Sequence, residues 1–169
     1  MTSMEYIAEM CKTKHYTQMR EWMNEWFGKD KPLVGLEIGI ERGVMEQTLL
    51  NEFPLLFMYG IDKIPRAYGH ERFNLLTMSS DSAVIHFKPQ QLDFVYIDGC
   101  HDYPQVRKDI LNYAPFVKDD GIVAGHDYVP NTTNPDDGVT RAVDELFDKD
   151  KVHFGEDLAW WIYKRDIKW

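Results

Sequence analysis

Two short segments hold the side chains with the clearest capacity for chemistry. Asp98 directly follows an apolar run, and His101 comes three residues later in the same loop. A second apolar run ends in Gly125, His126 and Asp127. Because neighbouring parallel strands bring their carboxyl ends to one sheet edge, we expect Asp98, His126 and Asp127 to meet there. Carboxylates suit Mg²⁺, and a histidine would also admit Mn²⁺, so a metal site is predicted; helix capping and mutual hydrogen bonds are the alternative.

The segment from Glu37 to Gly43 places a carboxylate and two glycines at the end of another apolar run. Glycine at such a turn lets backbone N–H groups approach a ligand closely. A dinucleotide fingerprint starting at Gly39 would need glycine at positions 41 and 44, where the chain has Glu41 and Val44. We therefore expect this turn to border a cofactor with a cationic end instead of a pyrophosphate. A purely structural strand-to-helix turn is the alternative.

Acidic and hydroxyl side chains follow the next two apolar runs. Asp62 ends the second run, where an acid typically accepts the two ribose hydroxyls of a nucleotide. Ser79, Ser80 and Asp81 follow the third run, where side chains can hydrogen-bond an adenine edge. The alternatives are a helix cap or a solvated acid for Asp62, and a helix cap for Ser80 or Asp81.

Short apolar runs alternate with amphipathic stretches and predict the elements that hold these residues. The runs are apolar on both faces, which is typical of buried parallel strands. They cover residues 33–40, 55–61, 73–78, 92–97 and 121–124. Helical spacing covers 103–117, with Pro104 in its first turn, and 139–147, with Asp136 and Asp137 as candidate caps. This alternation predicts a doubly wound α/β sheet.

Both ends of the chain depart from that alternation. Residues 1–28 show helical spacing twice and predict two amphipathic helices, with Thr2 and Glu5 as a candidate capping box and Gly28 ending the second helix. Residues 152–154 and 158–164 flank a tight turn and predict an antiparallel pair of strands. We expect one domain over 1–169, with a helical cap at 1–28 and an α/β core at 33–165.

Composition restricts the function classes. The 169 residues match one domain, and the net charge of -9 argues against general binding to nucleic-acid phosphates. No stretch approaches the ~18 apolar residues that span a bilayer, and the first residues lack a signal-like apolar segment. We expect a cytoplasmic protein without nucleic-acid or membrane partners. Cys11 and Cys100 fit neither a disulfide framework nor a zinc spacing, so free thiols are predicted.

Four segments together resemble the class I methyltransferases, and more closely the family of macrocin O-methyltransferase. They are 36–39 with 42–43, 94–99 with His101 and Tyr103, 121–128, and 138–143, and the likeness spans about 33–147. The resemblance implies a Rossmann-like sheet of seven strands, mostly parallel, with a C-terminal antiparallel hairpin. It also implies S-adenosylmethionine as cofactor and the following site residues: Glu37, Gly39 and Gly43 near its methionine part, Asp62 at its ribose, Ser80 and Asp81 at its adenine, and Asp98 beside it.

The same resemblance implies the catalytic groups. Asp98 and Asp127 correspond to metal ligands, and His101 to the general base. Two positions depart from the family: His126 stands where metal-dependent relatives often have an acid, and Cys100 where many have aspartate. We count His126 with Asp98 and Asp127 as a candidate ligand.

The expected reaction is methyl transfer to a hydroxyl of a small sugar or polyol-like molecule, assisted by Mg²⁺ or Mn²⁺. A metal-independent methyltransferase and a non-catalytic module that binds an adenosyl ligand are the alternatives, and Glu41 and Val44 disfavour a nicotinamide-dependent oxidoreductase. Trp22, Trp26, Tyr128 and the 130–137 loop are candidate lining for the acceptor, or core residues. Homo-oligomerisation stays open.

Overall fold

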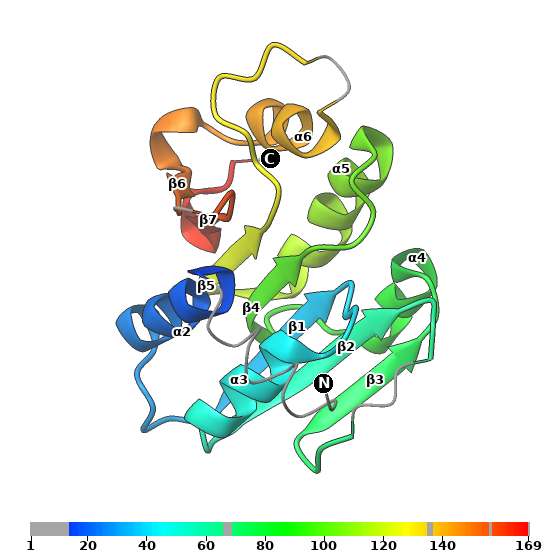
Figure 1. Cartoon of the computed structure of the whole chain (residues 1–169), viewed down its shortest axis with the longest axis vertical. Coiled ribbons are helices and arrows are strands. Elements are labelled where there is room, and N and C mark those ends of the chain that lie inside the picture. Colours follow the sequence, from blue (N-terminus) through cyan, green and yellow to red (C-terminus); the bar gives the residue numbers. More distant parts are fainter. Residues whose placement is uncertain (1–13, 66–68, 135–136, 156, 169) are drawn as a thin grey trace.

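A computed structural model describes residues 14–65, 69–134, 137–155 and 157–168. Seven strands form one sheet in the order β3-β2-β1-β4-β5-β7-β6 (Figure 1). Their bounds are β1 Leu33–Ile38, β2 Leu56–Asp62, β3 Phe73–Thr77, β4 Leu92–Ile97, β5 Val117–Gly125, β6 His153–Phe154 and β7 Trp160–Tyr163. Strands β1 to β5 pair in parallel, whereas β7 pairs antiparallel with both β5 and β6. The predicted Rossmann-like sheet with its antiparallel ending is confirmed.

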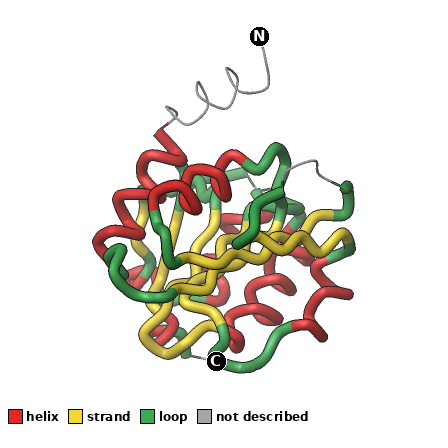
Figure 2. The backbone as a smooth tube through the Cα atoms, turned by 90° about the horizontal axis from the view of Figure 1, so that it is seen from below, coloured by secondary structure: helices red, strands yellow, loops and turns green. Residues whose placement is uncertain are grey.

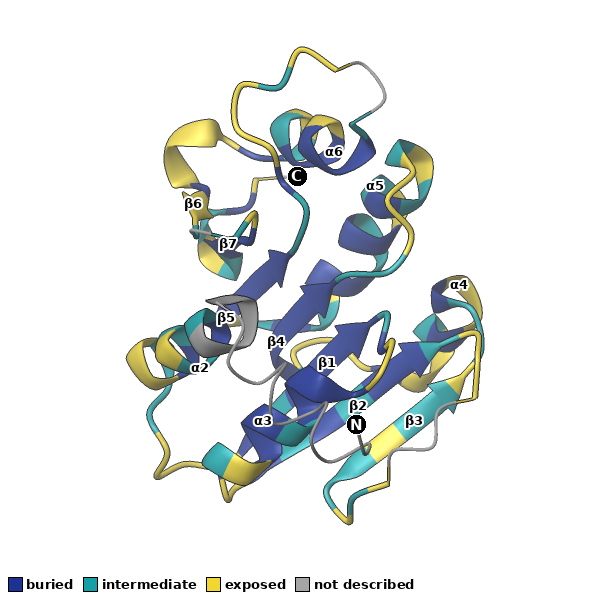
Figure 3. Ribbon diagram, in the orientation of Figure 1, coloured by how far each residue is buried: buried dark blue, intermediate teal, exposed yellow. Residues whose placement is uncertain are grey.

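Helices cover both faces of this sheet, as Figure 2 shows. Helices α2 (Lys14–Trp26) and α3 (Val44–Glu52) share one apolar cluster with inward residues such as Phe94 and Ile122. Helices α5 (Tyr103–Tyr113) and α6 (Gly138–Leu146), with the short α4 (Ser80–Ala83), pack on the opposite face against residues such as Val95. Because both faces are covered, β4 is buried along its whole length and β1 is buried except at Val34, which is partly exposed (Figure 3).

Two predicted boundaries need correction. The first strand ends before Gly39, because this glycine has φ +94° and leaves the extended conformation. The predicted helix 103–117 ends at Tyr113, since Pro115 lacks the N–H that would continue it, and residues 114–116 form a 3₁₀ turn. Placing Val117 on that helix was therefore wrong: it begins β5, which is longer than the predicted 121–124.

The helix ends otherwise follow the local chemistry of the sequence. The Asp137 side chain accepts from the N–H of Thr140 and caps α6, as expected. Gly28 has φ +69° and follows the end of α2, also as expected. The first predicted helix, the capping box at Thr2 and Asp136 lie outside the described residues. Among the helices that the structure describes, none combines the length and apolarity needed to span a membrane.

Arg72 ties the start of β3 to the end of α3. Its Nη1 donates to the carbonyls of Phe53 at 2.9 Å and Leu56 at 2.7 Å, and its Nη2 donates to the carbonyl of Leu50 at 2.6 Å. The carbonyls of Leu50 and Phe53 are among those that a helix end leaves without intrahelical partners, and Leu56 begins β2. Arg72 thereby fixes the helix that begins directly after the Gly39 turn.

We expect Arg72→Ala to lower the free energy of unfolding by about 2–4 kcal/mol, because three charge-assisted hydrogen bonds are lost at a half-buried position. Urea denaturation of both proteins at pH 7 measures the difference. Arg165→Ala, at an exposed arginine that lies over the Tyr163 ring, is the matched control and should cost at most about 1 kcal/mol. A loss no greater than the control's would remove this structural role from Arg72.

Candidate functional site

A cavity of about 520 Å³ opens at the carboxyl edge of the parallel strands. This volume lies in the range that holds a small-molecule cofactor. Of the residues predicted for the site, the following line it: Glu37, Gly39, Asp62, Ser80, Asp81, Asp98 and His101. Gly43, His126 and Asp127 do not contribute to its wall. The cavity lies where the strand order reverses between β1 and β4, the usual ligand position in open α/β sheets.

The turn after β1 depends on glycine. A Cβ atom at Gly39 would lie 2.1 Å from the carbonyl oxygen of Asp98, and the φ of +94° disfavours any L side chain. The loops after β1 and β4 can therefore approach each other closely only with glycine at this position. Gly43, with φ +72°, precedes α3 and reverses the chain into that helix. Of the two predicted glycines, Gly39 thus forms part of the cavity wall, and Gly43 lies outside the wall at the start of α3.

Asp62 is held in a fixed orientation at the end of β2. Its Oδ2 accepts from the N–H of Ile40 at 3.2 Å, and its Oδ1 accepts from the N–H of Ile64 at 2.8 Å. A carboxylate offers about four lone-pair sites, so two backbone bonds leave capacity for further donors. The carboxylate connects the β1 and β2 loops and remains able to accept hydroxyl groups from a ligand in the cavity.

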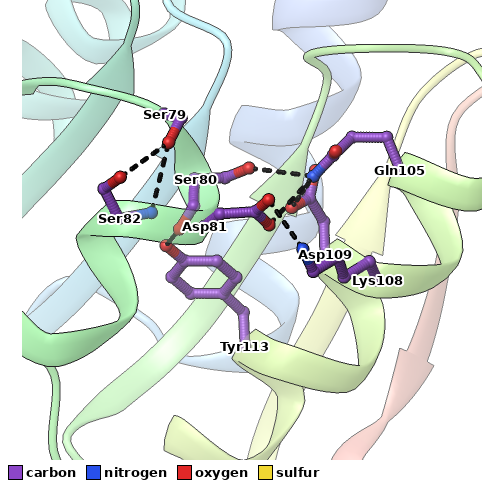
Figure 4. Close-up of polar contacts among 8 residues, drawn as sticks. All are labelled: Ser79, Ser80, Asp81, Ser82, Gln105, Lys108, Asp109 and Tyr113. Carbon is purple, nitrogen blue, oxygen red and sulfur yellow. Dashed lines mark hydrogen bonds and ion pairs between the residues drawn. The ribbon is translucent and has the colours of Figure 1, made fainter.

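Helix α4, which follows β3, presents Ser80 and Asp81 next to α5 (Figure 4). The cap of α4 is Ser79, whose Oγ accepts from the N–H of Ser82 at 3.2 Å, so the alternative that Ser80 or Asp81 caps this helix is wrong. Asp81 pairs with Lys108 Nζ at 2.7 Å. Ser80 and Asp81 thus form the first turn of α4 and line the cavity from there.

Two residues of α5 that the sequence did not single out complete this end of the cavity. Gln105 Nε2 donates to Asp109 Oδ1 at 3.0 Å and to Ser80 Oγ at 3.2 Å (Figure 4). Asp109 is only 1% exposed, and its burial raises the pKa of its carboxyl group. Both residues line the cavity. The available signal was their spacing of four on a helix face that otherwise buries Val106 and Ile110.

At the rim, the loops after β4 and β5 bring three side chains of types that bind metals together. Single donor atoms of Asp98, His101 and Asp127 all lie within 4.8 Å of one another. His101 Nε2 is 3.6 Å from Asp98 Oδ1 and 3.1 Å from Asp127 Oδ2. The Asp98 carboxylate, followed by that of Asp127, raises the pKa of the His101 imidazole. Without a competing cation, this histidine is therefore readily protonated between two acids.

His126 lies beside this cluster and points elsewhere. Its Nε2 contacts the carbonyl oxygen of Asp157, and its Nδ1 is 3.4 Å from Asp127 Oδ1. Burial lowers the pKa of His126, but the bond to Asp127 and the charge of Asp98 outweigh it, so the pKa is raised overall. Asp127 has φ +60°, a conformation that aspartate tolerates better than most residues. The geometry thus groups His101, rather than His126, with the two carboxylates.

The donor set of this cluster fits a divalent cation. Two carboxylate oxygens and one imidazole nitrogen suit Mg²⁺ with retained waters, or Mn²⁺. The side chains of Asp98, His101 and Asp127 are 26%, 54% and 33% exposed, so solvent or a substrate oxygen can reach the same point.

The aromatic residues considered for the acceptor pack elsewhere. Trp22 and Trp26 contact Trp161 on the α2 face of the sheet, with ring centroids 6.3 and 5.0 Å apart. Tyr128 is 5% exposed, and its hydroxyl donates to Asp144 at 2.9 Å. None of these side chains lines the cavity beside Gly39. These three side chains pack within the fold, outside this cavity wall.

Comparison with known proteins identifies a family. A family model described as a methyltransferase domain matches residues 36–128, which include the turn after β1 and the strand ends of the rim cluster. No curated protein matches the sequence.

Solved structures with the same fold include MycE methyltransferase from the mycinamycin biosynthetic pathway, in complex with Mg, SAH and mycinamycin VI. Its TM-score is 0.65 at 16% identity, over 86% of this chain and 48% of that one. A protein assigned as a caffeoyl-CoA O-methyltransferase from Staphylococcus aureus has a TM-score of 0.67 at 14% identity, over 96% and 91% of the two chains. This chain spans about half the length of the MycE chain. At these identities the likeness shows a shared fold.

Proposed function

We propose that this chain, which belongs to the methyltransferase domain family, transfers the methyl group of S-adenosylmethionine to a hydroxyl oxygen of a small molecule. One observation carries the proposal: the cavity at the strand reversal has carboxylates along its wall and the Asp98–His101–Asp127 cluster at its rim. The carboxylates of the wall suit a cationic cofactor, and the cluster at the rim supplies a proton acceptor for the hydroxyl. A sugar or polyol-like acceptor is the substrate class we propose.

We assign the parts of the cofactor to the cavity wall in order. Glu37 offers negative charge to the methionine end, Asp62 offers oxygens to the ribose hydroxyls, and Ser80 offers a hydroxyl to the adenine. Gly39 permits close backbone approach between the first two. Holding two reactants at attack distance can lower an activation barrier by about 7–11 kcal/mol. The main catalytic contribution of these residues is therefore to bind and orient the cofactor.

His101 is the group proposed to take the proton of the acceptor hydroxyl. Its side chain is 54% exposed at the rim, so an acceptor can reach Nε2 and the proton can pass on to solvent. Asp98 and Asp127 stabilise the imidazolium that forms. One positioned general base of this kind contributes about 10²- to 10⁴-fold to a rate.

Asp98 and Asp127 are the residues that would hold a divalent cation, and the His101 imidazole beside them stays available to accept the proton. When bound, such a cation supplies Lewis-acid activation of the acceptor hydroxyl. The MycE structures contain Mg together with SAH, which supports this proposal for a chain with the same fold. His126 orients Asp127 from outside the cluster.

A bound cation should change the titration of His101. We expect Mg²⁺ to lower the pKa of this imidazole, because the cation neutralises the two carboxylates that raise it. NMR titration of the histidine ring signals with and without saturating Mg²⁺ measures the shift. The exposed His86 is the internal control and should not move. An identical His101 titration in both conditions would contradict metal binding at this cluster.

The activity is tested by incubating the protein with methyl-labelled S-adenosylmethionine and a panel of sugars and polyols. The proposal predicts label in a hydroxyl product, loss of transfer in excess chelator and recovery with Mg²⁺. Transfer that persists in chelator would establish a metal-independent methyltransferase instead. Cofactor binding without transfer to any hydroxyl acceptor would favour a non-catalytic binding module.

A further inference from the structure

Two buried glutamates face each other at the floor of the cavity. Glu37, on β1, lines the cavity and is 5% exposed, whereas Glu46, on α3, lies behind it and is fully buried. The two carboxyl groups are close enough to share a hydrogen bond. Both oxygens of Glu46 and the Oε2 of Glu37 find no hydrogen-bond donor in the described part of the chain. If both carboxyl groups were ionised, these oxygens would have neither a hydrogen-bond donor nor a positive charge beside them from the residues that the structure describes.

The surroundings of the pair add negative charge. Asp98 and Asp62 act on Glu37 from the ends of β4 and β2, and Asp62 also acts on Glu46. The register partners of Glu37 are Tyr96 on β4 and Gly60 on β2. Neither glutamate forms an ion pair with a lysine or arginine among the described residues.

Two ionised carboxylates cannot stay buried side by side without compensation, so the pair must retain a proton when the cavity holds no ligand. Burial and the charge of Glu46 raise the pKa of Glu37 well above its usual range. Burial raises the pKa of Glu46 to about 7. The raised pKa values and the oxygens without donors lead to the same conclusion. Near neutral pH, the ligand-free pair binds a proton.

We infer that Glu46 is a positioning residue that shares one proton with Glu37, and that the pair releases this proton when the cationic end of the cofactor docks against Glu37. The inference rests on the proposed function, because it requires S-adenosylmethionine in this cavity. The cationic group of the cofactor replaces the shared proton, which leaves to solvent. The total charge at the floor of the cavity, cofactor group included, is therefore unchanged. The affinity for the cofactor is consequently linked to pH.

Glu46→Gln separates this role from a merely structural one. The amide has nearly the same shape, can donate to Glu37 and carries no titratable proton. Glu37 can then stay ionised in the empty cavity, so cofactor binding no longer requires release of the shared proton. Glu52→Gln is the matched control: Glu52 ends the same helix, pairs with Lys29 and Arg20 at the surface, and lies away from the cavity.

The experiment is calorimetric titration with S-adenosylmethionine at pH 6.5 in buffers of different ionisation enthalpy, which yields the number of protons released. Wild type and Glu52→Gln should release about one proton more than Glu46→Gln. SAH retains the ammonium but lacks the sulfonium, and adenosine lacks both. Proton release on binding of SAH would assign the effect to the ammonium group. Proton release with S-adenosylmethionine alone would assign it to the sulfonium. Equal proton release with adenosine would overturn the inference.

A second measurement needs no variant. For wild type, the Kd for S-adenosylmethionine should fall by up to about tenfold for each unit by which the pH rises toward 7, because binding releases a proton, and should level off above pH 7. Cofactor binding in the cavity without this pH dependence, or with equal proton release by wild type and Glu46→Gln, would overturn the inference and leave the proposed function standing. Absence of any binding of S-adenosylmethionine or SAH would overturn the proposed function, and this inference with it.

Discussion

The His101→Ala variant is expected to turn over about 10²- to 10⁴-fold more slowly than wild type, because the acceptor hydroxyl loses the group that takes its proton. Its Kd for S-adenosylmethionine should stay within about threefold of wild type, since the side chain is half exposed at the rim while the cofactor contacts lie deeper. Steady-state rates with labelled cofactor, together with calorimetric titration, measure both quantities.

His86→Ala is the matched control for this variant. His86 is an exposed histidine on the short 3₁₀ helix that follows α4, outside the cavity wall. Its substitution should leave rate and affinity unchanged. If His101→Ala weakened cofactor binding as strongly as it slowed turnover, His101 would be a binding residue and the proton acceptor would have to be another group.

Gly39→Ala is expected to have the largest effect on the fold and on cofactor affinity together. The added Cβ would lie 2.1 Å from the Asp98 carbonyl oxygen, at a backbone φ of +94°. We expect the free energy of unfolding to fall by about 3–5 kcal/mol, because strain and a backbone clash act at one residue. The displaced loops should weaken the binding of S-adenosylmethionine by at least about 100-fold.

Gly69→Ala tests whether this effect depends on position. A Cβ at Gly69 would meet no atom within 4 Å, so both stability and affinity should remain close to wild type. Urea denaturation and calorimetry on the two variants provide the comparison. A stable Gly39→Ala protein with unchanged cofactor affinity would show that the close contact between the β1 and β4 loops is unnecessary for the site.

The central strands were predictable because burial on both faces leaves a plain apolar run, as in Leu92–Ile97. The expected burial on both faces was wrong for β3, an edge strand whose residues are partly or fully exposed. Helix α3 was missed because it, like the central strands, is largely buried. Six of its residues are buried, including Thr48 and Glu46, so the sequence lacks the alternation of polar and apolar faces that marks a surface helix. Where a helix packs on most sides, hydrophobic periodicity gives little signal.

The site was predictable where the strand ends alone decide the geometry. Gly39, Asp62 and Asp98 lie at or directly after the ends of neighbouring parallel strands and line one cavity, as expected from topology. Side-chain directions depended on contacts distant in sequence. His126 is oriented by the carbonyl of Asp157, thirty-one residues later, which turns its Nε2 away from the rim cluster.

The buried partner of the cavity floor was not predictable from the sequence. Glutamate is seldom fully buried, so Glu46 is more readily interpreted as a surface residue of a loop or helix. Only the packing of α3 against β1 reveals that its carboxyl group faces Glu37. The same applies to Asp109, whose burial depends on how α5 packs beside the β3 loop.

The most direct test of the central claim is a crystal structure of the protein with bound SAH. We predict the adenosyl ligand in the cavity beside Gly39, with its ribose hydroxyls on Asp62, its adenine at Ser80 and its ammonium group against Glu37. If the ligand bound elsewhere and left this cavity empty, the cavity would not be the cofactor site, and the assignments made from it would be wrong.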